Sequence, residues 1–395
     1  MNEMNRTPNS QRRASAAPNA PGGTAVQQAP RKKKKSGLAG RIIRRTLLMF
    51  FTIVALLLVG VVMILNLIFN GPSTAARDTL TMSLTEASAT KWVPGLFLGD
   101  ELVAQIRANV EADLPDEYSS TDQIVINMNS NAGQTDEWAN CPDGIRIEEY
   151  QGETYKAHIM IIRDPSKVYM ATSTDGPYSK DVPGTRINHE IVSEGAIAAI
   201  NAGAFNDDGT ANAYVGAIPA GLVMAGGKVK SDTAYEYLQE EGFAGFNQDN
   251  ILIVAKDMTA EKALELGIRD GCCFGPVLIM NGVVNQEAYN SKSGLNPRTA
   301  IGQRADGAVI FLCIDGRQAI SLGGTYKDVI DIMVEYGAVN ACNMDGGSSS
   351  LMYYKDTYGL YGEAGSYQVV NNPALLQAEP RKMPNFWMVR PAEEG

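Results

Sequence analysis

The sequence predicts a mixed α/β protein, with one globular domain outside a membrane and a single membrane-spanning helix before it. Three observations predict this architecture. A basic stretch precedes a long uncharged apolar run near the N-terminus. Short apolar runs separated by glycine turns fill the second half of the chain, as in a protein rich in strands. Finally, residues 308–345 read as strand, helix and strand, the order of a βαβ unit in a mixed sheet.

The apolar run extends from Thr46 to Phe69 and contains no charged residue. A helix of that length spans roughly 36 Å, which exceeds the hydrocarbon thickness of about 30 Å. A cleaved signal peptide usually has an apolar region of only about 7–15 residues, so an uncleaved anchor is the better interpretation. Eight Lys and Arg residues lie between positions 31 and 45. By the positive-inside rule they keep the N-terminus cytoplasmic and the rest of the chain extracytoplasmic.

Composition divides the chain into four parts. Residues 1–45 are predicted to be a disordered basic cytoplasmic tail, and residues 46–69 the membrane helix. Residues 70–149 form a membrane-proximal helical and linker region, in which Gly99–Leu114 has the apolar spacing of a helix. Residues 150–392 form the globular domain.

The net charge of −10 averages two segments of opposite sign. The first 45 residues hold eleven Lys and Arg against one Glu, whereas the chain after residue 70 holds 23 basic and 43 acidic residues. An acidic domain argues against a nucleic-acid partner, because affinity for nucleic acids comes mainly from Lys and Arg on phosphates. The membrane is the partner expected for the basic segment. No sequence feature indicates an oligomeric state.

The five cysteines do not resemble a disulfide framework. Their number is odd, and Cys272 and Cys273 are neighbours, which rarely bond each other. Cys313 and Cys342 lie in apolar runs, where a free cysteine behaves as a small hydrophobic residue. There is no Cys/His spacing typical of zinc sites, so no structural zinc is expected.

Four turns separate apolar runs of the domain, and each predicts a β-hairpin. They lie at Asp164–Lys167, Gly226–Gly227, Asn281–Gly282 and Asp306–Gly307. The apolar run Gly195–Asn201 predicts a buried strand. Helices are predicted at Thr259–Leu266 and Tyr326–Tyr336, and Thr325 with Asp328 resembles a capping box at the start of the second one.

In the predicted βαβ unit, one strand ends at Asp315 and the other at Asp345. Such a unit makes the two strands parallel, so both carboxylates are expected at one edge of the sheet, where open α/β sheets bind ligands. The glycines and serines of segment 346–349 could hold an anion through their N–H groups and hydroxyls. An ordinary glycine turn is the alternative interpretation.

A second polar segment, Asn201–Gly209, also ends a predicted strand. Asp207 and Asp208 could ligate a hard cation such as Ca²⁺, but they lack the spacing of an EF-hand, and a polar turn is the alternative. Arg298 and Arg317 flank the predicted strand ends. A guanidinium matches the oxygens of a phosphate, although each arginine alone could equally form a surface ion pair.

Absent motifs narrow the chemistry. Only His158 and His189 occur, and the nucleophile elbow GxSxG, the zinc motif HExxH and the Walker A motif are all missing. Acid/base chemistry must therefore fall mostly on carboxylates. That pattern is typical of enzymes that act on glycosidic bonds rather than of peptidases.

Several motifs together resemble the phosphodiester glycosidase family. They are AAINAGAF, GPVLIMNG, NPRTAIGQRADGAVIFLCIDGRQ, GAVNACNMDGGSSSLMY, VVNNP and PRKMPNFWMV, and they occur between about residues 150 and 392. The resemblance implies a single mixed α/β domain that removes a sugar from a sugar-1-phosphodiester without an organic cofactor. The sequence departs from the family pattern at Ala202 and Ala204, and at Ser348, which replaces the third glycine of a triplet.

Carried over residue by residue, the resemblance and the local patterns assign a catalytic group and a substrate-binding group. The expected catalytic residues are Asp345, Asp315, Arg298 and Asn201. The expected substrate-binding residues are Gly203, Phe205, Thr299, Arg317, Gly346, Gly347, Ser348, Ser349 and Arg381. No metal ligand is assigned, although Ca²⁺ at the Asp207–Asp208 segment is kept as an alternative.

The resulting hypothesis is a membrane-anchored hydrolase that cleaves sugar-1-phosphodiesters in cell-surface or exopolysaccharide glycans. Its partner is then a carbohydrate or phosphoglycan substrate. The alternative is a non-catalytic binding or scaffolding module for phosphate-containing cell-wall polymers. An enzyme requires its carboxylates for turnover, whereas a binding module depends mainly on its arginines.

Overall fold

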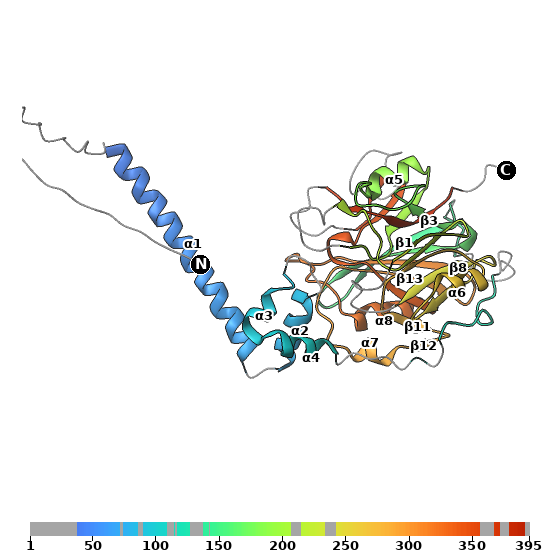
Figure 1. The fold of residues 1–395 in the computed structure, drawn as a ribbon, viewed down its shortest axis with the longest axis horizontal. Helices are drawn as coiled ribbons and strands as arrows, with labels where there is room; N and C mark the ends of the chain where they lie inside the picture. Colours follow the sequence, from blue (N-terminus) through green and yellow to red (C-terminus); the bar gives the residue numbers. More distant parts are fainter. Residues whose placement is uncertain are drawn as a thin grey trace, which may run out of the picture. The chain divides into compact units, whose positions relative to one another are not determined.

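The computed structural model describes residues 38–71, 74–85, 90–108, 114, 117–126, 137–141, 143–206, 215–233, 242–355, 367–371 and 379–391. The chain divides into two units, residues 1–61 and 62–395. Figure 1 shows the fold, which contains helices and several sheets as the sequence predicts.

Helix α1 (Leu38–Asn70) contains the apolar run. Its stretch Ile42–Asn70 is long and apolar enough to cross a membrane, and no other helix of the described residues meets that test. The helix begins at Leu38, so the last eight residues of the predicted disordered tail are helical. The rest of that tail, residues 1–37, lies outside the described residues.

Three short helices follow in the membrane-proximal region, α2 (Thr74–Thr85), α3 (Val93–Leu98) and α4 (Asp100–Ala108). The helix predicted at Gly99–Leu114 is therefore confirmed at its start, and residues 109–113 lie outside the described residues. Phe97 of α3 stacks on Phe69 with ring centroids 5.0 Å apart. Helix α2 also reaches the globular domain, because a Cβ on Gly294 would lie 2.1 Å from the hydroxyl of Ser83.

The largest sheet, sheet I, has seven strands in the order β1-β2-β14-β13-β15-β11-β12. Their bounds are β1 (Ile145–Gln151), β2 (Lys156–Ile162), β14 (Val309–Ile314), β13 (Arg298–Arg304), β15 (Ala338–Met344), β11 (Val277–Met280) and β12 (Val283–Val284). The first strand of sheet I begins at Ile145, five residues before the predicted start of the domain at residue 150. The hairpin turns predicted at Asn281–Gly282 and Asp306–Gly307 are confirmed, because they join β11 to β12 and β13 to β14.

The two strands of the predicted βαβ unit run in the same direction, as expected, but they are not neighbours in the sheet. Strands β14 and β15 both pair antiparallel with β13, so they run parallel to each other with β13 between them. The other described strand pairs of sheet I are antiparallel as well, whereas a mixed sheet was expected. Helix α8 (Tyr326–Glu335) makes the crossover and begins with the predicted capping box of Thr325 and Asp328.

Two five-stranded sheets complete the domain. Sheet II has the order β7-β6-β10-β8-β9, and sheet III has the order β17-β16-β5-β19-β3. Sheet II consists of β7 (Lys228–Asp232), β6 (Leu222–Ala225), β10 (Ile268–Cys273), β8 (Phe243–Asn247) and β9 (Leu252–Ala255). Sheet III consists of β17 (Tyr367–Val369), β16 (Met352–Lys355), β5 (Ala198–Asn201), β19 (Asn385–Val389) and β3 (Val168–Thr172).

Three of the remaining predictions concern sheets II and III. The turn Gly226–Gly227 joins β6 to β7, and β5 is buried, as predicted. The hairpin predicted around Asp164–Lys167 is wrong: the chain does turn there, in the 3-10 helix η1 (Pro165–Lys167), but β2 belongs to sheet I and β3 to sheet III. A chain that turns and passes from one sheet to another has the same local sequence pattern as a hairpin.

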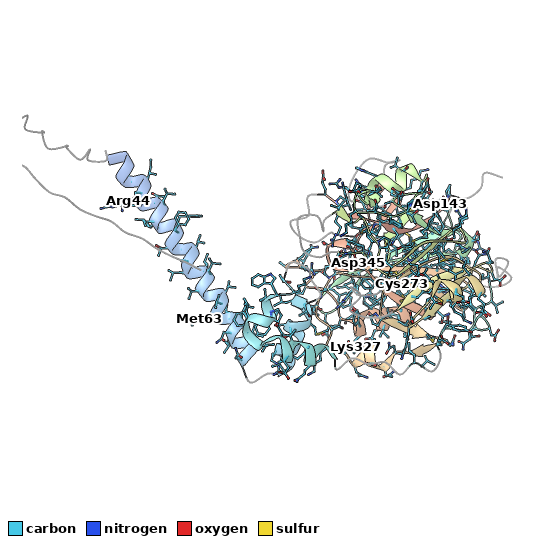
Figure 2. All side chains as sticks on the ribbon, viewed as in Figure 1. Arg44, Met63, Asp143, Cys273, Lys327 and Asp345 are labelled. Carbon is cyan, nitrogen blue, oxygen red and sulfur yellow. The ribbon has the colours of Figure 1, made fainter. Side chains whose placement is uncertain are left out.

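The main core is built from side chains of all three sheets. Figure 2 draws the described side chains on the ribbon. It contains Phe311 of sheet I, Phe246 of sheet II and Trp387 of sheet III, all fully buried, and the last two meet edge to face at 5.6 Å. Burial of such large apolar side chains is the main source of folding free energy.

Helices cover the outer faces of the sheets. Helix α8 packs on sheet I, α5 (Ile187–Ser193) on sheet III and α6 (Ala260–Glu265) on sheet II, and α6 lies within the predicted helix Thr259–Leu266. Helix α7 (Gln286–Asn290) lies beside α8, and the short strands β4 (Thr185–Arg186) and β18 (Lys382–Met383) form a separate pair. Figure 1 shows α5 and α8 on opposite sides of this domain.

Candidate functional site

One edge of sheet I gathers the predicted carboxylates. Strand β14 ends just before Asp315, strand β15 ends just before Asp345, and the antiparallel strand β13 begins with Arg298 at the same edge. The registers Arg298↔Ile314 and Thr299↔Met344 place these residues side by side along the edge. The prediction that Asp315 and Asp345 leave the same edge is thus confirmed.

Asn201 connects this edge to sheet III. Its side chain is fully buried, and its Nδ2 donates to the carbonyl oxygen of Asp345 at 2.5 Å. Its Oδ1 accepts from the hydroxyl of Thr299 at 2.8 Å and from the backbone N–H of Leu351 at 3.1 Å. The backbone N–H of Asp345 also donates to the carbonyl of Ala202 at 3.0 Å. These bonds hold the Asp345 turn from both sides.

The turn after Asp345 depends on its two glycines. The Oδ1 of Asp345 accepts from the N–H of Gly346 at 2.9 Å, and a Cβ on Gly346 would lie 2.8 Å from the carbonyl oxygen of Pro297. Gly347 has φ +63°, and a Cβ there would lie 3.1 Å from Nη2 of Arg317. The backbone therefore passes close to two neighbours in a conformation that suits glycine.

Arg381 brings three predicted segments together. Its Nη1 lies 3.3 Å from the hydroxyl oxygen of Ser348 and 3.5 Å from that of Ser349. Its guanidinium carbon lies 4.7 Å from the ring centroid of Phe205, a cation–π geometry. The structure thus joins the loop after β5, the turn after β15 and the segment before β18 around one cation.

Asp315 has a partner that was not predicted. Its carboxylate is 2% exposed, and its Oδ2 lies 3.2 Å from Nε2 of His158 on β2. Its Oδ1 accepts from Nδ2 of Asn371, which also donates to the carbonyl of Ser350. The scarcity of histidine was the only sequence signal at His158, because its pairing with Asp315 depends on strands far apart in the chain.

The two arginines near the edge differ in exposure. Arg298 is buried; its Nε donates to the carbonyl of Gly324 at 3.1 Å, its Nη2 to that of Gly294 at 2.8 Å, and its guanidinium stacks on Tyr326 at 4.3 Å. Arg317 is exposed, and its Nη2 donates to Oδ1 of Asn296 at 3.0 Å. Of the two, Arg317 is thus the one that solvent and a ligand can reach.

The predicted substrate-binding residues fall into two groups by burial. Those at least partly exposed are Phe205, Arg317, Gly346, Gly347, Ser348 and Arg381. Gly203, Thr299 and Ser349 are buried. A Cβ on Gly203 would lie 2.9 Å from Cβ of Cys272, and its N–H donates to Oδ1 of Asn385, so this glycine serves packing.

The cysteines are free, as expected. Burial raises the pKa of the Cys272, Cys313 and Cys342 thiols, which are therefore neutral near pH 7. A neutral buried thiol is a poor nucleophile, so these three residues do not suit covalent catalysis. Within the described part of the chain there is no group of three or more His, Cys, Asp or Glu that could hold a metal ion. The candidate Ca²⁺ ligands Asp207 and Asp208 lie outside that part.

Comparison with known proteins gives the family of the domain. The model of the phosphodiester glycosidase family matches residues 194–390, a range that includes both carboxylates and Arg381. Residues 194–390 belong to the phosphodiester glycosidase family. Strands β1, β2 and β3 precede the range matched to the phosphodiester glycosidases, and β2 contributes His158 to the site.

Individual relatives are distant. The SPbeta prophage-derived uncharacterized protein YomE of Bacillus subtilis (strain 168) is 27% identical over 165 residues, which cover 39% of this chain and 24% of that protein. This chain therefore spans about a quarter of the length of that relative.

The similar solved structures include two that cover more than half of this chain. One is the catalytic domain of zebrafish N-acetylglucosamine-1-phosphodiester alpha-N-acetylglucosaminidase, with 17% identity, a TM-score of 0.49 and coverage of 64% of this chain and 85% of that one. The other is a hypothetical protein from Synechocystis, with 15% identity, a TM-score of 0.42 and coverage of 62% of each chain.

Proposed function

We propose that this protein is a membrane-anchored hydrolase that cleaves the glycosidic bond of sugar-1-phosphodiesters in cell-surface or exopolysaccharide glycans. The observation that carries the proposal is the contact of Arg381 with Ser348, Ser349 and Phe205, next to the Asp345 turn of a phosphodiester glycosidase domain. A cation, two hydroxyls and a carboxylate suit a substrate that carries a sugar and a phosphate.

The chemistry of the leaving group supports this assignment. A phosphate that departs from the anomeric carbon is already a weak base, so it needs little help from a general acid. It does need its charge stabilised in the transition state. We assign that task to the guanidinium of Arg381, the hydroxyl of Ser348 and the exposed Arg317, while the buried Ser349 helps to hold Arg381.

Exposure suggests different roles for the two carboxylates. Asp345 is partly exposed, so it is the carboxylate that we assign to the sugar, as base or as stabiliser of the oxocarbenium-like transition state. Asp315 is buried against His158 and Asn371, and we assign it to the support of the edge. Asn201, Thr299 and Arg298 are then positioning residues, because their side chains are buried and bond to neighbouring protein groups.

Sugar release tests the proposal. The full chain in detergent is incubated with UDP-N-acetylglucosamine and other sugar-1-phosphodiesters, and free sugar is measured. We expect Asp345→Asn to reduce release by about 100-fold or more, the usual scale for loss of a general acid or base. Lys327→Ala, which changes an exposed cation on α8, is the control and should release sugar like the parent.

The alternative, a polymer-binding module, predicts a different result. Such a module would bind phosphate-containing glycans without releasing sugar from any of these substrates. Its binding would survive Asp345→Asn but fall in Arg381→Gln. These outcomes would contradict the hydrolase proposal and support the binding module instead.

A further inference from the structure

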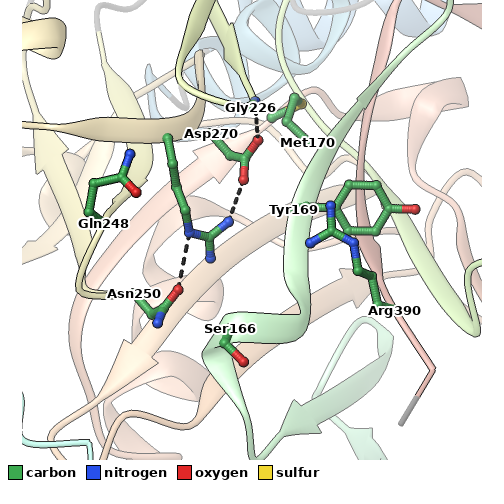
Figure 3. A pocket seen from close by; sticks show the side chains of 9 residues that line it. Ser166, Tyr169, Met170, Gly226, Gln248, Asn250, Asp270 and Arg390 are labelled. Atoms are coloured by element: carbon green, nitrogen blue, oxygen red, sulfur yellow. Dashed lines mark hydrogen bonds and ion pairs between the residues drawn. The ribbon is translucent and has the colours of Figure 1, made fainter. Parts of the chain in front are cut away.

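A pocket in the domain lies away from the Asp345 turn, between the ends of sheets II and III (Figure 3). It encloses about 420 Å³, within the range of small-ligand pockets. It is lined by Ser166, Tyr169, Met170, Gly226, Gln248, Asn250, Arg269, Asp270 and Arg390. We call it the Arg390 pocket.

The Arg390 pocket and the candidate active site lie at opposite ends of the same strands. Arg390 directly follows β19, whose first residue, Asn385, bonds to Gly203. Arg269 and Asp270 lie near the start of β10, whose last residue, Cys273, accepts from the N–H of Ala204. The two sites are therefore separated by the length of a strand.

Arg269 forms a fixed wall of the pocket. Its Nη1 and Nη2 donate to the carbonyls of Val168 and Pro165 at 2.8 and 3.1 Å, and its Nε donates to Oδ1 of Asn250 at 3.1 Å. It also pairs with the carboxylate of Asp270, whose other oxygen accepts from the N–H of Gly226 (Figure 3). The charge of Arg269 is thus neutralised, and its donors are used within the protein.

Arg390 differs from Arg269. It is exposed, and its guanidinium carbon lies 4.1 Å from the ring centroid of Tyr169, which holds it at the pocket (Figure 3). No carboxylate of the described residues pairs with it; Glu194 instead accepts from the hydroxyl of Tyr169, at 3.3 Å. The pocket therefore contains two guanidinium groups and one carboxylate, although the chain after residue 70 is strongly acidic.

Uncharged hydrogen-bonding groups complete the lining. Gln248 is exposed and has no hydrogen-bond partner among the described residues, and Asn250 uses its Oδ1 on Arg269. Their amide groups can bond to hydroxyls of a ligand, while the planar guanidinium of Arg390 matches two oxygens of an anion. Such a combination of one unneutralised cation and several amides suits a small polar anion better than an apolar ligand.

We propose that the Arg390 pocket is a second saccharide site, which binds a sugar carrying a phosphate group. Arg390 binds the phosphate, and the amides of Gln248 and Asn250 bind sugar hydroxyls. This inference is independent of catalysis at Asp345, because binding at Arg390 can be measured whether or not sugar is released.

Calorimetric titration of the full chain in detergent tests the inference, with α-D-glucose 1-phosphate as the probe. We expect Arg390→Gln to weaken binding at one site by about tenfold or more, the scale of a lost charge-assisted hydrogen bond, and to leave sugar release unchanged. Arg381→Gln, in the candidate active site, should leave that site intact. Lys167→Gln is the matched control, because it removes the same charge next to Arg390 without lining the pocket.

Several results would overturn the inference. Binding by Arg390→Gln equal to that of the parent would exclude the site, and an equal loss in Lys167→Gln would show only a diffuse charge effect. Methyl glucoside bound as tightly as the probe would exclude phosphate recognition, and equally tight inorganic phosphate would exclude sugar recognition. If Arg390→Gln lowers the melting temperature, Arg390→Lys replaces it. That variant keeps the positive charge but loses the planar guanidinium that can bond to two oxygens, so we expect severalfold weaker binding.

Discussion

Nε2 of His158 lies 3.2 Å from Oδ2 of Asp315, and the two side chains are only 4% and 2% exposed, respectively. A carboxylate removed from water needs hydrogen bonds to its charged form, and His158 and Asn371 supply them. Nδ1 of His158 is buried with no partner in the described part of the chain, so the contact with Asp315 is made through Nε2. The pair joins β2 to the end of β14, at the edge of sheet I where the candidate site lies.

Replacing His158 by Leu should destabilise the domain. The change removes a hydrogen bond to a buried charge, so the free energy of unfolding should fall by about 1.5–3 kcal/mol. Urea unfolding followed by tryptophan fluorescence, to which the buried Trp387 contributes, measures this loss. The double variant with Asp315→Asn completes a cycle, and strictly additive effects of the two substitutions would show that the contact contributes nothing.

Asn201 should contribute more to the stability of the domain than its partner Thr299. Asn201→Ala removes bonds to Thr299, Leu351 and Asp345, and we expect a loss of about 2–4 kcal/mol in unfolding free energy together with slower sugar release. Thr299→Val removes the bond to Asn201 and a weak contact with Sγ of Cys313, and should lose about 1 kcal/mol. Equal losses in the two variants would contradict the role of Asn201 in holding the Asp345 turn.

Gly203→Ala should destabilise the protein through crowding. The added Cβ would lie 2.9 Å from Cβ of Cys272 and 3.0 Å from the carbonyl oxygen of Cys273, so we expect a loss of about 1–3 kcal/mol. Gly176→Ala is the control, since its Cβ would lie 3.7 Å from the nearest atom, the hydroxyl of Thr174. Thermal unfolding compares the two variants. Similar melting temperatures would show that the neighbours of Gly203 can move to make room for the added Cβ.

Glu190 should make stability depend on pH. Burial and the nearby charge of Glu194 raise the pKa of its carboxyl, so the folded state binds a proton more tightly than the unfolded state. This residue's contribution to stability is therefore largest in acid and declines as pH rises above the ordinary glutamate pKa. Glu190→Gln should raise the melting temperature at pH 7 relative to the parent, and by less at pH 4. A gain that is the same at both pH values would contradict this explanation.

The sequence by itself determined the features that depend on neighbouring residues. The apolar helix, the turns at Gly226–Gly227 and Asn281–Gly282 and the capping box of α8 follow from local hydrophobicity, glycine conformation and capping chemistry. The strand-ending positions of Asp315 and Asp345 were also predictable, because a polar residue after a buried strand has a simple local pattern.

Only the tertiary structure decided which of these elements meet. The insertion of β13 between β14 and β15 and the separation of β2 from β3 depend on how three sheets bury one core. The contacts of His158 with Asp315 and of Arg381 with Phe205, and the Arg390 pocket, depend on the same packing. Local sequence patterns do not predict these contacts, because the free energy that stabilises them comes from burial between segments far apart in the chain.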